Sequence, residues 1–71
     1  MIHARNLKTS KPLQRVDAVL ADFMPHSTRD IARGADVCAV NSIIDELRES
    51  KNGRDIRHFQ VGRNHYYKRV G

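Results

Sequence analysis

The sequence is poor in the residues that disulfides, metal sites and membrane insertion require. It holds one cysteine and no tryptophan in 71 residues, so an internal disulfide is excluded, and Cys38 alone cannot form a structural zinc site. No apolar run approaches the length of a membrane span, and the first residues lack the apolar stretch of a signal peptide. We therefore expect a cytoplasmic protein that does not enter a membrane.

Motifs of catalysis are also lacking. There is no glycine-rich phosphate loop and no HExxH sequence, and no nucleophile, base and orienting group stand at a workable spacing. A chain of 71 residues forms one domain, and a domain of this size buries only about 60% of the surface that its unfolded chain exposes. We expect no enzyme, no catalytic residue, no cofactor and no bound metal.

Acidic residues are scarce at both ends of the chain and concentrated in the middle. Residues 1–15 carry four basic and no acidic side chains, and residues 16–50 carry three basic and seven acidic ones. Residues 51–71 carry six basic side chains and one acidic one, Asp55, and the net charge of the whole chain is +5. The last segment also contains Asn64 and a Tyr-Tyr pair, a mixture typical of a surface that binds a polyanion. The alternative is a solvated charged surface without a ligand.

Apolar periodicity predicts the first ordered element. Residues 1–10 show no periodicity and are predicted to form a flexible basic arm. Pro12 suits the first turn of a helix. Apolar residues then recur at steps of three and four at Leu13, Val16, Val19, Leu20 and Phe23. Since Pro25 cannot continue this helix, we expect it to end at Met24 or Pro25.

A second and a third helix are predicted next. Ser27 and Asp30 have the form of a capping box at the start of helix two, and Gly34 supplies the turn after it. Asp36 can cap helix three, which we expect over residues 37–50. Its apolar side consists of Val37, Val40, Ile43, Ile44 and Leu47.

The remaining residues are expected to form a β-hairpin. Asn52-Gly53 is a turn signal, and β-prone residues roughly alternate after it. We predict strands at Ile56–Val61 and His65–Val70, joined by Gly62-Arg63-Asn64. The predicted fold class is α+β, with three helices followed by a two-stranded β-hairpin.

Residues 11–71, arranged in this way, resemble the winged helix-turn-helix domain of the biotin operon repressor and of related small bacterial and phage regulators. The strongest likeness is the stretch Val40–Arg48, which is similar to the recognition helix of that family. Weaker likenesses occur at His26-Ser27, Asp55-Ile56 and Tyr66-Tyr67. The step from Ala32 to Val40 is shorter than in the family. The likeness covers the DNA-binding domain alone, so it implies DNA binding and no biotin-linked activity.

The resemblance implies that helix 37–50 lies in the major groove with its first turns nearest the bases. The outward positions, and hence the candidate base contacts, are Cys38, Ala39, Asn41, Ser42 and Asp45. Asn41 can pair with adenine through two hydrogen bonds, Ser42 can contact a base or a phosphate, and Ala39 can touch a thymine methyl group. The alternative is an ordinary exposed helix face. Because this face has no Arg, Lys or Gln, we expect modest base specificity from it.

Most of the affinity is then expected from phosphate contacts, which position a protein without reading sequence. The candidate phosphate or minor-groove contacts are Arg29, Arg54, Arg57, Arg63, Asn64, Lys68 and Arg69. Arg63 and Asn64, at the predicted hairpin tip, can reach a minor groove.

These observations predict sequence-dependent binding of double-stranded DNA by a small transcriptional regulator, of the kind that a phage or another mobile element carries. Two alternatives stay open. One is a protein-interaction module that forms a homodimer or docks on a partner protein. The other is an RNA-binding domain in which Phe59, Tyr66 and Tyr67 stack on unpaired bases. Cys38, His58 and His65 are suitable zinc donors, but their spacing is not a zinc pattern.

Overall fold

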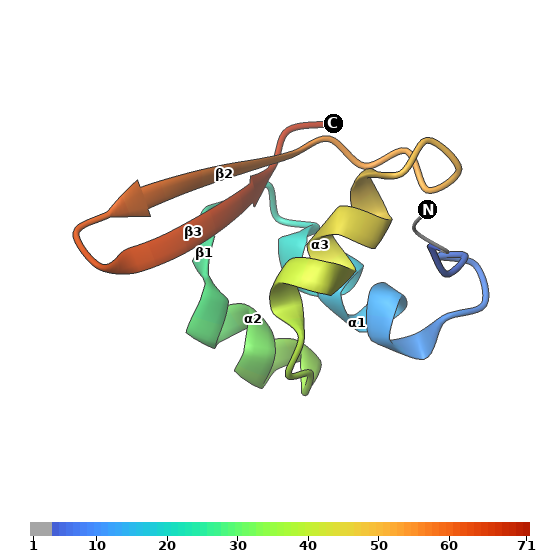
Figure 1. Ribbon diagram of the computed structural model, residues 1–71, viewed down its shortest axis with the longest axis horizontal. Helices are drawn as coiled ribbons and strands as arrows, with labels where there is room; N and C mark the ends of the chain where they lie inside the picture. Colours follow the sequence, from blue (N-terminus) through green and yellow to red (C-terminus); the bar gives the residue numbers. More distant parts are fainter. Residues whose placement is uncertain (1–3) are drawn as a thin grey trace.

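The computed structural model describes residues 4–71. Its elements are α1 (Lys11–Leu20), β1 (His26–Ser27), α2 (Thr28–Ala35), α3 (Val40–Arg48), β2 (Ile56–Val61) and β3 (Asn64–Arg69). Three helices and an antiparallel sheet confirm the predicted α+β class (Figure 1). The sheet has three strands, in the order β1-β3-β2, where two were predicted. The additional strand is β1, because His26 and Ser27 pair with Tyr67 and Tyr66.

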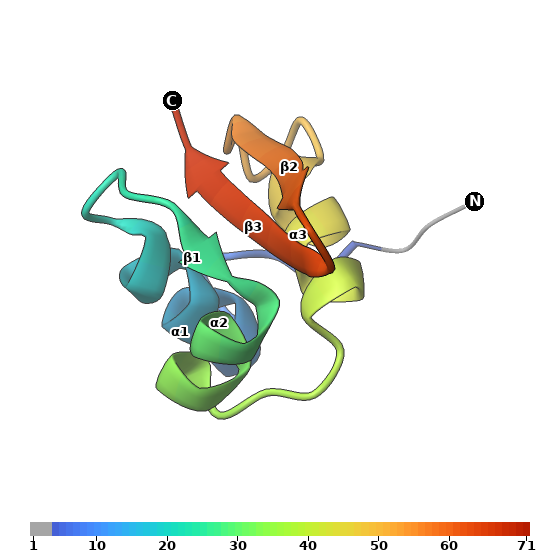
Figure 2. The same ribbon diagram turned by 90° about the vertical axis from the view of Figure 1, so that its left-hand side faces the viewer.

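The hairpin of β2 and β3 projects away from the helices. Figure 1 shows its turn at the far end from the body of the domain. Figure 2 shows β1 on one side of the hairpin and α3 on the other, with α2 below it. Within residues 4–71, no helix has the length and apolar character needed to cross a bilayer.

The core lies between the three helices and the base of the hairpin. Its buried members are Leu13, Val16, Leu20, Ile31, Ala35, Val40, Ile43, Ile44, Leu47, Ile56 and Tyr67. The members from α1 and α3 recur at steps of three and four, so each helix buries one stripe. The predicted inner faces are therefore confirmed except at Phe23, which is exposed, and at Val37, which is half-buried in the connection before α3.

Helix α1 ends at Leu20 and not at Met24 or Pro25 as predicted. The side chain of Asp22 accepts a hydrogen bond from the backbone nitrogen of Met24 at 2.9 Å, which stabilises a turn in place of another helical turn. Phe23 adopts a positive φ of 59° and is 47% exposed. It therefore lies outside the core that its spacing predicted.

Helix α2 begins as predicted and ends later. The Ser27 hydroxyl accepts a hydrogen bond from the backbone nitrogen of Asp30 at 3.1 Å, which confirms Ser27 as the N-cap. The helix continues through Gly34 to Ala35. A Cβ atom on Gly34 would lie 3.1 Å from a methyl carbon of Val19, so glycine here lets α1 and α2 approach closely.

The connection between α2 and α3 also differs from the prediction, because α2 extends beyond Gly34. Asp36 takes the left-handed conformation with φ of 53° and caps the end of α2, so it does not cap α3. Helix α3 begins at Val40 with Ala39 as its N-cap, and it ends at Arg48. It is shorter at both ends than the predicted helix 37–50.

The hairpin register is close to the predicted one. Strand β2 has the predicted bounds, and β3 begins and ends one residue earlier than expected. The connection is therefore Gly62-Arg63 alone, with Gly62 at φ of 61°. A left-handed residue in a two-residue connection matches the twist of a hairpin, which explains the glycine.

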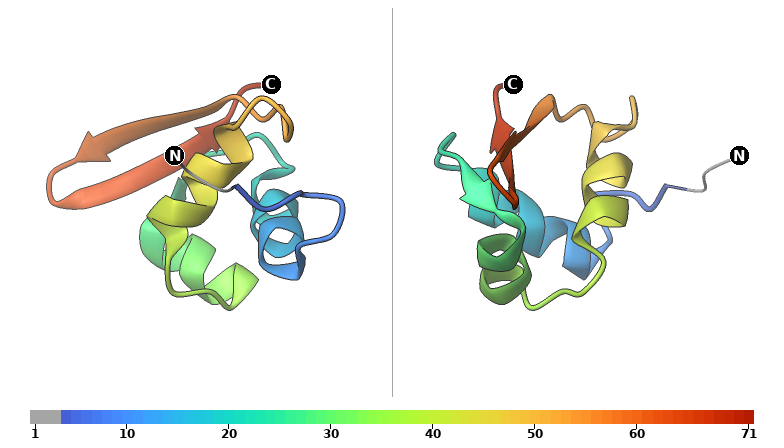
Figure 3. Two further views of the ribbon diagram at one scale, coloured as in Figure 1. Left: turned by 45° about the vertical axis from the view of Figure 1, so that its right-hand side comes forward. Right: turned by 60° about the vertical axis from the view of Figure 1, so that its left-hand side comes forward.

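The flexible arm predicted for residues 1–10 falls partly on residues 1–3, which lie outside the described part. Residues 4–10 lie against the domain, and Figure 3 shows them passing close to α3 in both views. The Arg5 guanidinium contacts the Glu46 carboxylate at 2.7 and 3.0 Å. This placement was not foreseen from the sequence.

Asn52 connects the same segment to the end of α3. Its amide nitrogen donates to the backbone oxygens of Arg5 at 2.9 Å and Glu46 at 2.8 Å, and its oxygen accepts from the backbone nitrogen of Leu7 at 2.9 Å. Asn52 is 7% exposed, so these bonds satisfy a buried amide. Asn52, which the sequence indicated only as part of a turn, therefore also makes tertiary contacts.

We predict that Glu46→Gln makes the stability of the domain less sensitive to acid. The hydrogen bonds from Arg5 hold the pKa of Glu46 below its ordinary value of 4.5, against the opposing effect of burial. The pKa of Glu46 is lower in the folded state than in the unfolded state. The ion pair therefore stabilises the fold fully above the unfolded pKa, and this stabilisation is lost as the pH falls through the lowered, folded pKa. The variant should lose about 1 kcal/mol at pH 7 and less in acid.

Urea unfolding followed by circular dichroism between neutral and acidic pH measures this difference. Asp45→Asn is the matched control, since Asp45 is exposed and its carboxylate lies 3.9 Å from Arg48. If Glu46→Gln and the wild type lost stability in parallel on acidification, the ion pair would not stabilise the fold.

Candidate nucleic-acid interface

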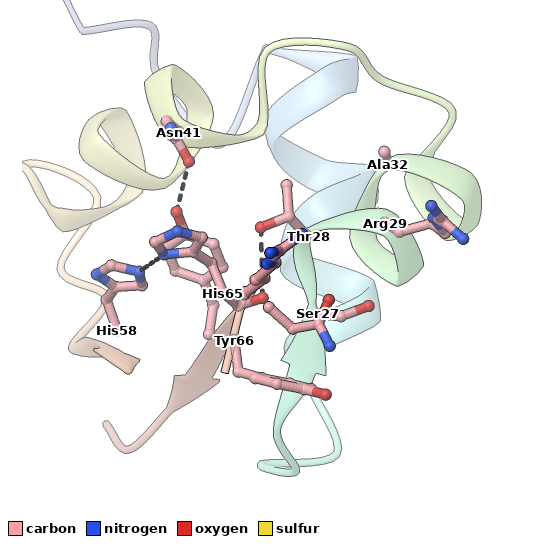
Figure 4. A pocket seen from close by; sticks show the side chains of 11 residues that line it. Ser27, Thr28, Arg29, Ala32, Asn41, His58, His65 and Tyr66 are labelled. Atoms are coloured by element: carbon pink, nitrogen blue, oxygen red, sulfur yellow. Dashed lines mark hydrogen bonds between the residues drawn. The ribbon is translucent and has the colours of Figure 1, made fainter. Parts of the chain in front are cut away.

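A groove of about 700 Å³ lies between the hairpin and the starts of α2 and α3. It is lined by Ser27, Thr28, Arg29, Ala32, Asn41, His58, Arg63, Asn64, His65, Tyr66 and Tyr67. Figure 4 shows Asn41, His58, His65 and Thr28 close together where α3, the hairpin and α2 meet, with Arg29 extending outward from α2. The lining contains two arginines, two asparagines and no carboxylate, so its chemistry suits an anionic ligand with polar groups.

Three side-chain contacts fix the walls of the groove. The Tyr67 hydroxyl donates a hydrogen bond to Oδ1 of Asn41, which joins the hairpin to α3 (Figure 4). The Thr28 hydroxyl donates to the backbone oxygen of His65 at 3.4 Å, which joins α2 to the hairpin. Nε2 of His58 and Nδ1 of His65 lie 2.8 Å apart. The elements around the groove are therefore held in one relative position.

The structure divides the seven predicted phosphate contacts into three sets. The first set, Arg54 and Arg69, is engaged within the domain. Arg54 contacts the Asp17 carboxylate at 2.7 and 3.2 Å, and this hydrogen bonding raises its pKa. The Arg69 guanidinium lies 3.8 Å from the same carboxylate and 4.9 Å from the centre of the Phe23 ring. These two residues have structural partners.

The second set, Arg57 and Lys68, lies on the outer face of the hairpin. They are cross-strand partners, and side chains alternate between the two faces of a strand. Their neighbours His58 and Tyr67 belong to the groove side, so Arg57 and Lys68 point the other way, and neither lines the groove. Phe59 and Tyr66 stack with ring centres 5.6 Å apart on the same two strands, and Tyr66 also lines the groove.

The third set, Arg29, Arg63 and Asn64, lines the groove. Arg29 lies in the first turn of α2, and Arg63 and Asn64 lie at the hairpin tip. In residues 4–71, neither arginine takes part in an ion pair with an acidic side chain. Within these residues Lys68 likewise has no such partner but lies on the outer face, while Arg57 lies 3.7 Å from the Asp55 carboxylate.

The predicted base contacts are mostly brought together at the start of α3. A second hollow of about 310 Å³ is lined by Thr28, Cys38, Ala39, Val40, Asn41 and Ser42. Cys38 and Ala39 lie in the connection before α3 and not within it. Asp45 is exposed one turn further along α3 and outside both hollows. Its carboxylate would oppose a close phosphate.

Several groove residues were missed by sequence reasoning. Thr28 and His65 approach one another only because β1 pairs with β3, and a two-residue strand leaves no periodic signal. His58 could have been found from the hairpin register, which places it opposite Tyr67. Within residues 4–71, no cluster of three or more His, Cys, Asp or Glu side chains could hold a metal ion.

Comparison of the chain with protein-family models, curated proteins and solved structures finds no significant match.

Proposed function

We propose that this chain is a winged helix-turn-helix module that binds double-stranded DNA in a sequence-dependent way, as a small transcriptional regulator. The observation that carries the proposal is the groove without carboxylates, whose two arginines have no acidic partner in residues 4–71. It lies where the hairpin, α2 and the exposed start of α3 meet. In winged helices these are the elements that contact a duplex.

In the proposed complex the start of α3 enters the major groove. Asn41 and Ser42 are exposed there and face base edges. Arg29, beside the N-terminus of the eight-residue α2, contacts one phosphate strand, aided by the positive end of the helix dipole. Arg63 and Asn64 at the hairpin tip contact the backbone or the adjacent minor groove. The proposal assigns no DNA contact to Arg54 or Arg69.

Duplex DNA fits this surface better than unpaired RNA. Stacking on unpaired bases needs an aromatic ring with an open face. Tyr67 is 6% exposed and its ring stacks on His58, while Phe59 and Tyr66 stack on each other, so that each has one face left. The cations and amides of the groove, namely Arg29, Arg63, Asn41 and Asn64, outnumber its one partly open tyrosine ring, Tyr66, which favours contacts to a phosphate backbone and base edges over stacking.

A competition experiment tests the proposal. A fluorescent random-sequence DNA duplex is bound at physiological salt and challenged with unlabelled duplex or with single-stranded RNA of the same length. We expect the duplex to displace the probe at least about tenfold more effectively than the RNA, because the arginines are spaced on a rigid surface. Equal displacement would favour RNA binding, and a folded protein that binds neither probe would favour the protein-interaction hypothesis.

A further inference from the structure

Two histidines contact each other in the wall of the groove. Nε2 of His58 and Nδ1 of His65 lie 2.8 Å apart, and both residues are exposed (Figure 4). The Tyr67 ring, which lies opposite His58 in the hairpin, stacks on the His58 ring with centres 5.0 Å apart. The pair is therefore held in place by the hairpin and stays open to solvent, so it can exchange protons with water.

The hydrogen bond between the two rings determines how protons are distributed over the pair. A ring nitrogen of histidine carries either a lone pair or an N–H group, so one hydrogen atom lies between the two facing nitrogens. When both rings are neutral, the outer nitrogens, Nδ1 of His58 and Nε2 of His65, are one donor and one acceptor. One added proton converts the outer acceptor into a donor and keeps the bond between the rings. A second would place N–H against N–H and break it.

Resting on the proposed function, we propose that the His58–His65 pair is a further phosphate contact of the groove and takes up a proton when a duplex binds. With one added proton the pair carries one positive charge, and both of its outer nitrogens can donate to phosphate oxygens. The neutral pair presents a lone pair that a phosphate oxygen cannot satisfy. A bound phosphate therefore favours the charged pair, and a lower pH strengthens binding in the range where histidine titrates.

The charged groups around the pair suit this role. Those that line the groove beside the two histidines are Arg29, Arg63, Tyr66 and Tyr67. On α3, Asp45 lies outside the groove, and its carboxylate is 3.9 Å from Arg48. Among residues 4–71, no carboxylate lines the groove. The anion that stabilises the charged pair is therefore expected from the DNA backbone and not from the protein.

Duplex affinity measured between about pH 6 and about pH 8, at one ionic strength, tests the inference. We expect the wild type to bind about three- to tenfold more tightly at the lower pH. His58→Gln combined with His65→Gln should reduce this change to less than about twofold. His26→Gln is the matched control and should keep the wild-type change, because His26 lies outside the groove with its ring 2.9 Å from the Asp22 carboxylate.

His58→Gln combined with His65→Lys provides a second variant, in which the groove keeps one permanent positive charge and no histidine. It should bind several-fold more tightly than the double glutamine variant near pH 8 and should change little with pH. Calorimetric titration in buffers of different ionisation enthalpy counts the protons directly. Near pH 7, the wild type should take up about half a proton more per bound duplex than the double glutamine variant. Circular dichroism shows that each variant is folded.

The outcomes separate the inference from the proposed function. A wild-type affinity that does not change with pH, an equal change in the double glutamine variant, or a wild-type change in the lysine variant would each overturn the inference while leaving duplex binding in place. A folded wild type that binds no duplex at either pH would overturn the proposed function, and the role of the histidine pair with it.

Discussion

Leu47→Ala should lower the free energy of unfolding by about 2 to 5 kcal/mol. Leu47 has no exposed surface and lies in the apolar cluster that joins α1, α2, α3 and the base of the hairpin. Because the chain is short, few other large side chains can close the space that the substitution leaves. Small domains are stable by only about 5 kcal/mol, so a large fraction of the variant should be unfolded at 37 °C.

Urea unfolding followed by circular dichroism measures this loss. Val61→Ala is the matched control, because Val61 is 60% exposed near the hairpin tip and its truncation should change stability by less than about 0.5 kcal/mol. Equal effects of the two substitutions would mean that α3 does not bury the face that the structure assigns to it.

Helical periodicity explains how much of the fold could be predicted. Leu13, Val16 and Leu20 in α1, and Ile44 and Leu47 in α3, are buried because a helix that covers a core repeats its inner face every three or four residues. That regularity is local, so it can be read from a sequence. It failed at Phe23, where the Asp22 side chain stabilises a turn that apolar spacing does not report.

The error between α2 and α3 has a different cause. Gly34 is the residue type expected to end a helix, but its missing side chain serves the contact with Val19. Asp36 then takes the left-handed conformation that a glycine was predicted to supply, which Asp tolerates better than most residues. The choice depends on how two helices pack, and sequence spacing does not contain that information.

The sequence predicted which residue types the candidate site contains, but it predicted only some of the contacts that those residues make. The exposure of Asn41 and Ser42 followed from their positions on the helix. The pairing of Arg54 with Asp17 joins residues 37 positions apart, and the bond from Tyr67 to Asn41 joins residues 26 positions apart. Such contacts arise from the tertiary fold, so cations that appear equivalent in the sequence have different partners.

Arg29→Ala combined with Arg63→Ala should weaken binding to every DNA duplex by about 10- to 100-fold at physiological salt. Both side chains line the groove, and each is proposed to neutralise one phosphate and to release its counterions. The fold should persist, because both residues are exposed and such substitutions usually change stability by less than about 0.5 kcal/mol.

Arg57→Ala combined with Lys68→Ala is the matched control. It removes the same number of charges from the same molecule, but on the outer face of the hairpin. With a screening length of about 8 Å at physiological salt, charges on that face should contribute little to a duplex held in the groove. The two double variants therefore distinguish the effect of where the removed charges lie from the effect of how many charges are removed.

The most direct test is the duplex affinity of the wild type and of these two double variants, measured between about 50 and 200 mM salt. We predict that the groove variant lowers the slope of log affinity against log salt by about two units and that the outer-face variant lowers it by less than about half a unit. Equal slopes for the two variants would show that net charge, and not the groove, carries binding. A wild-type slope retained by the groove variant would contradict the proposed interface.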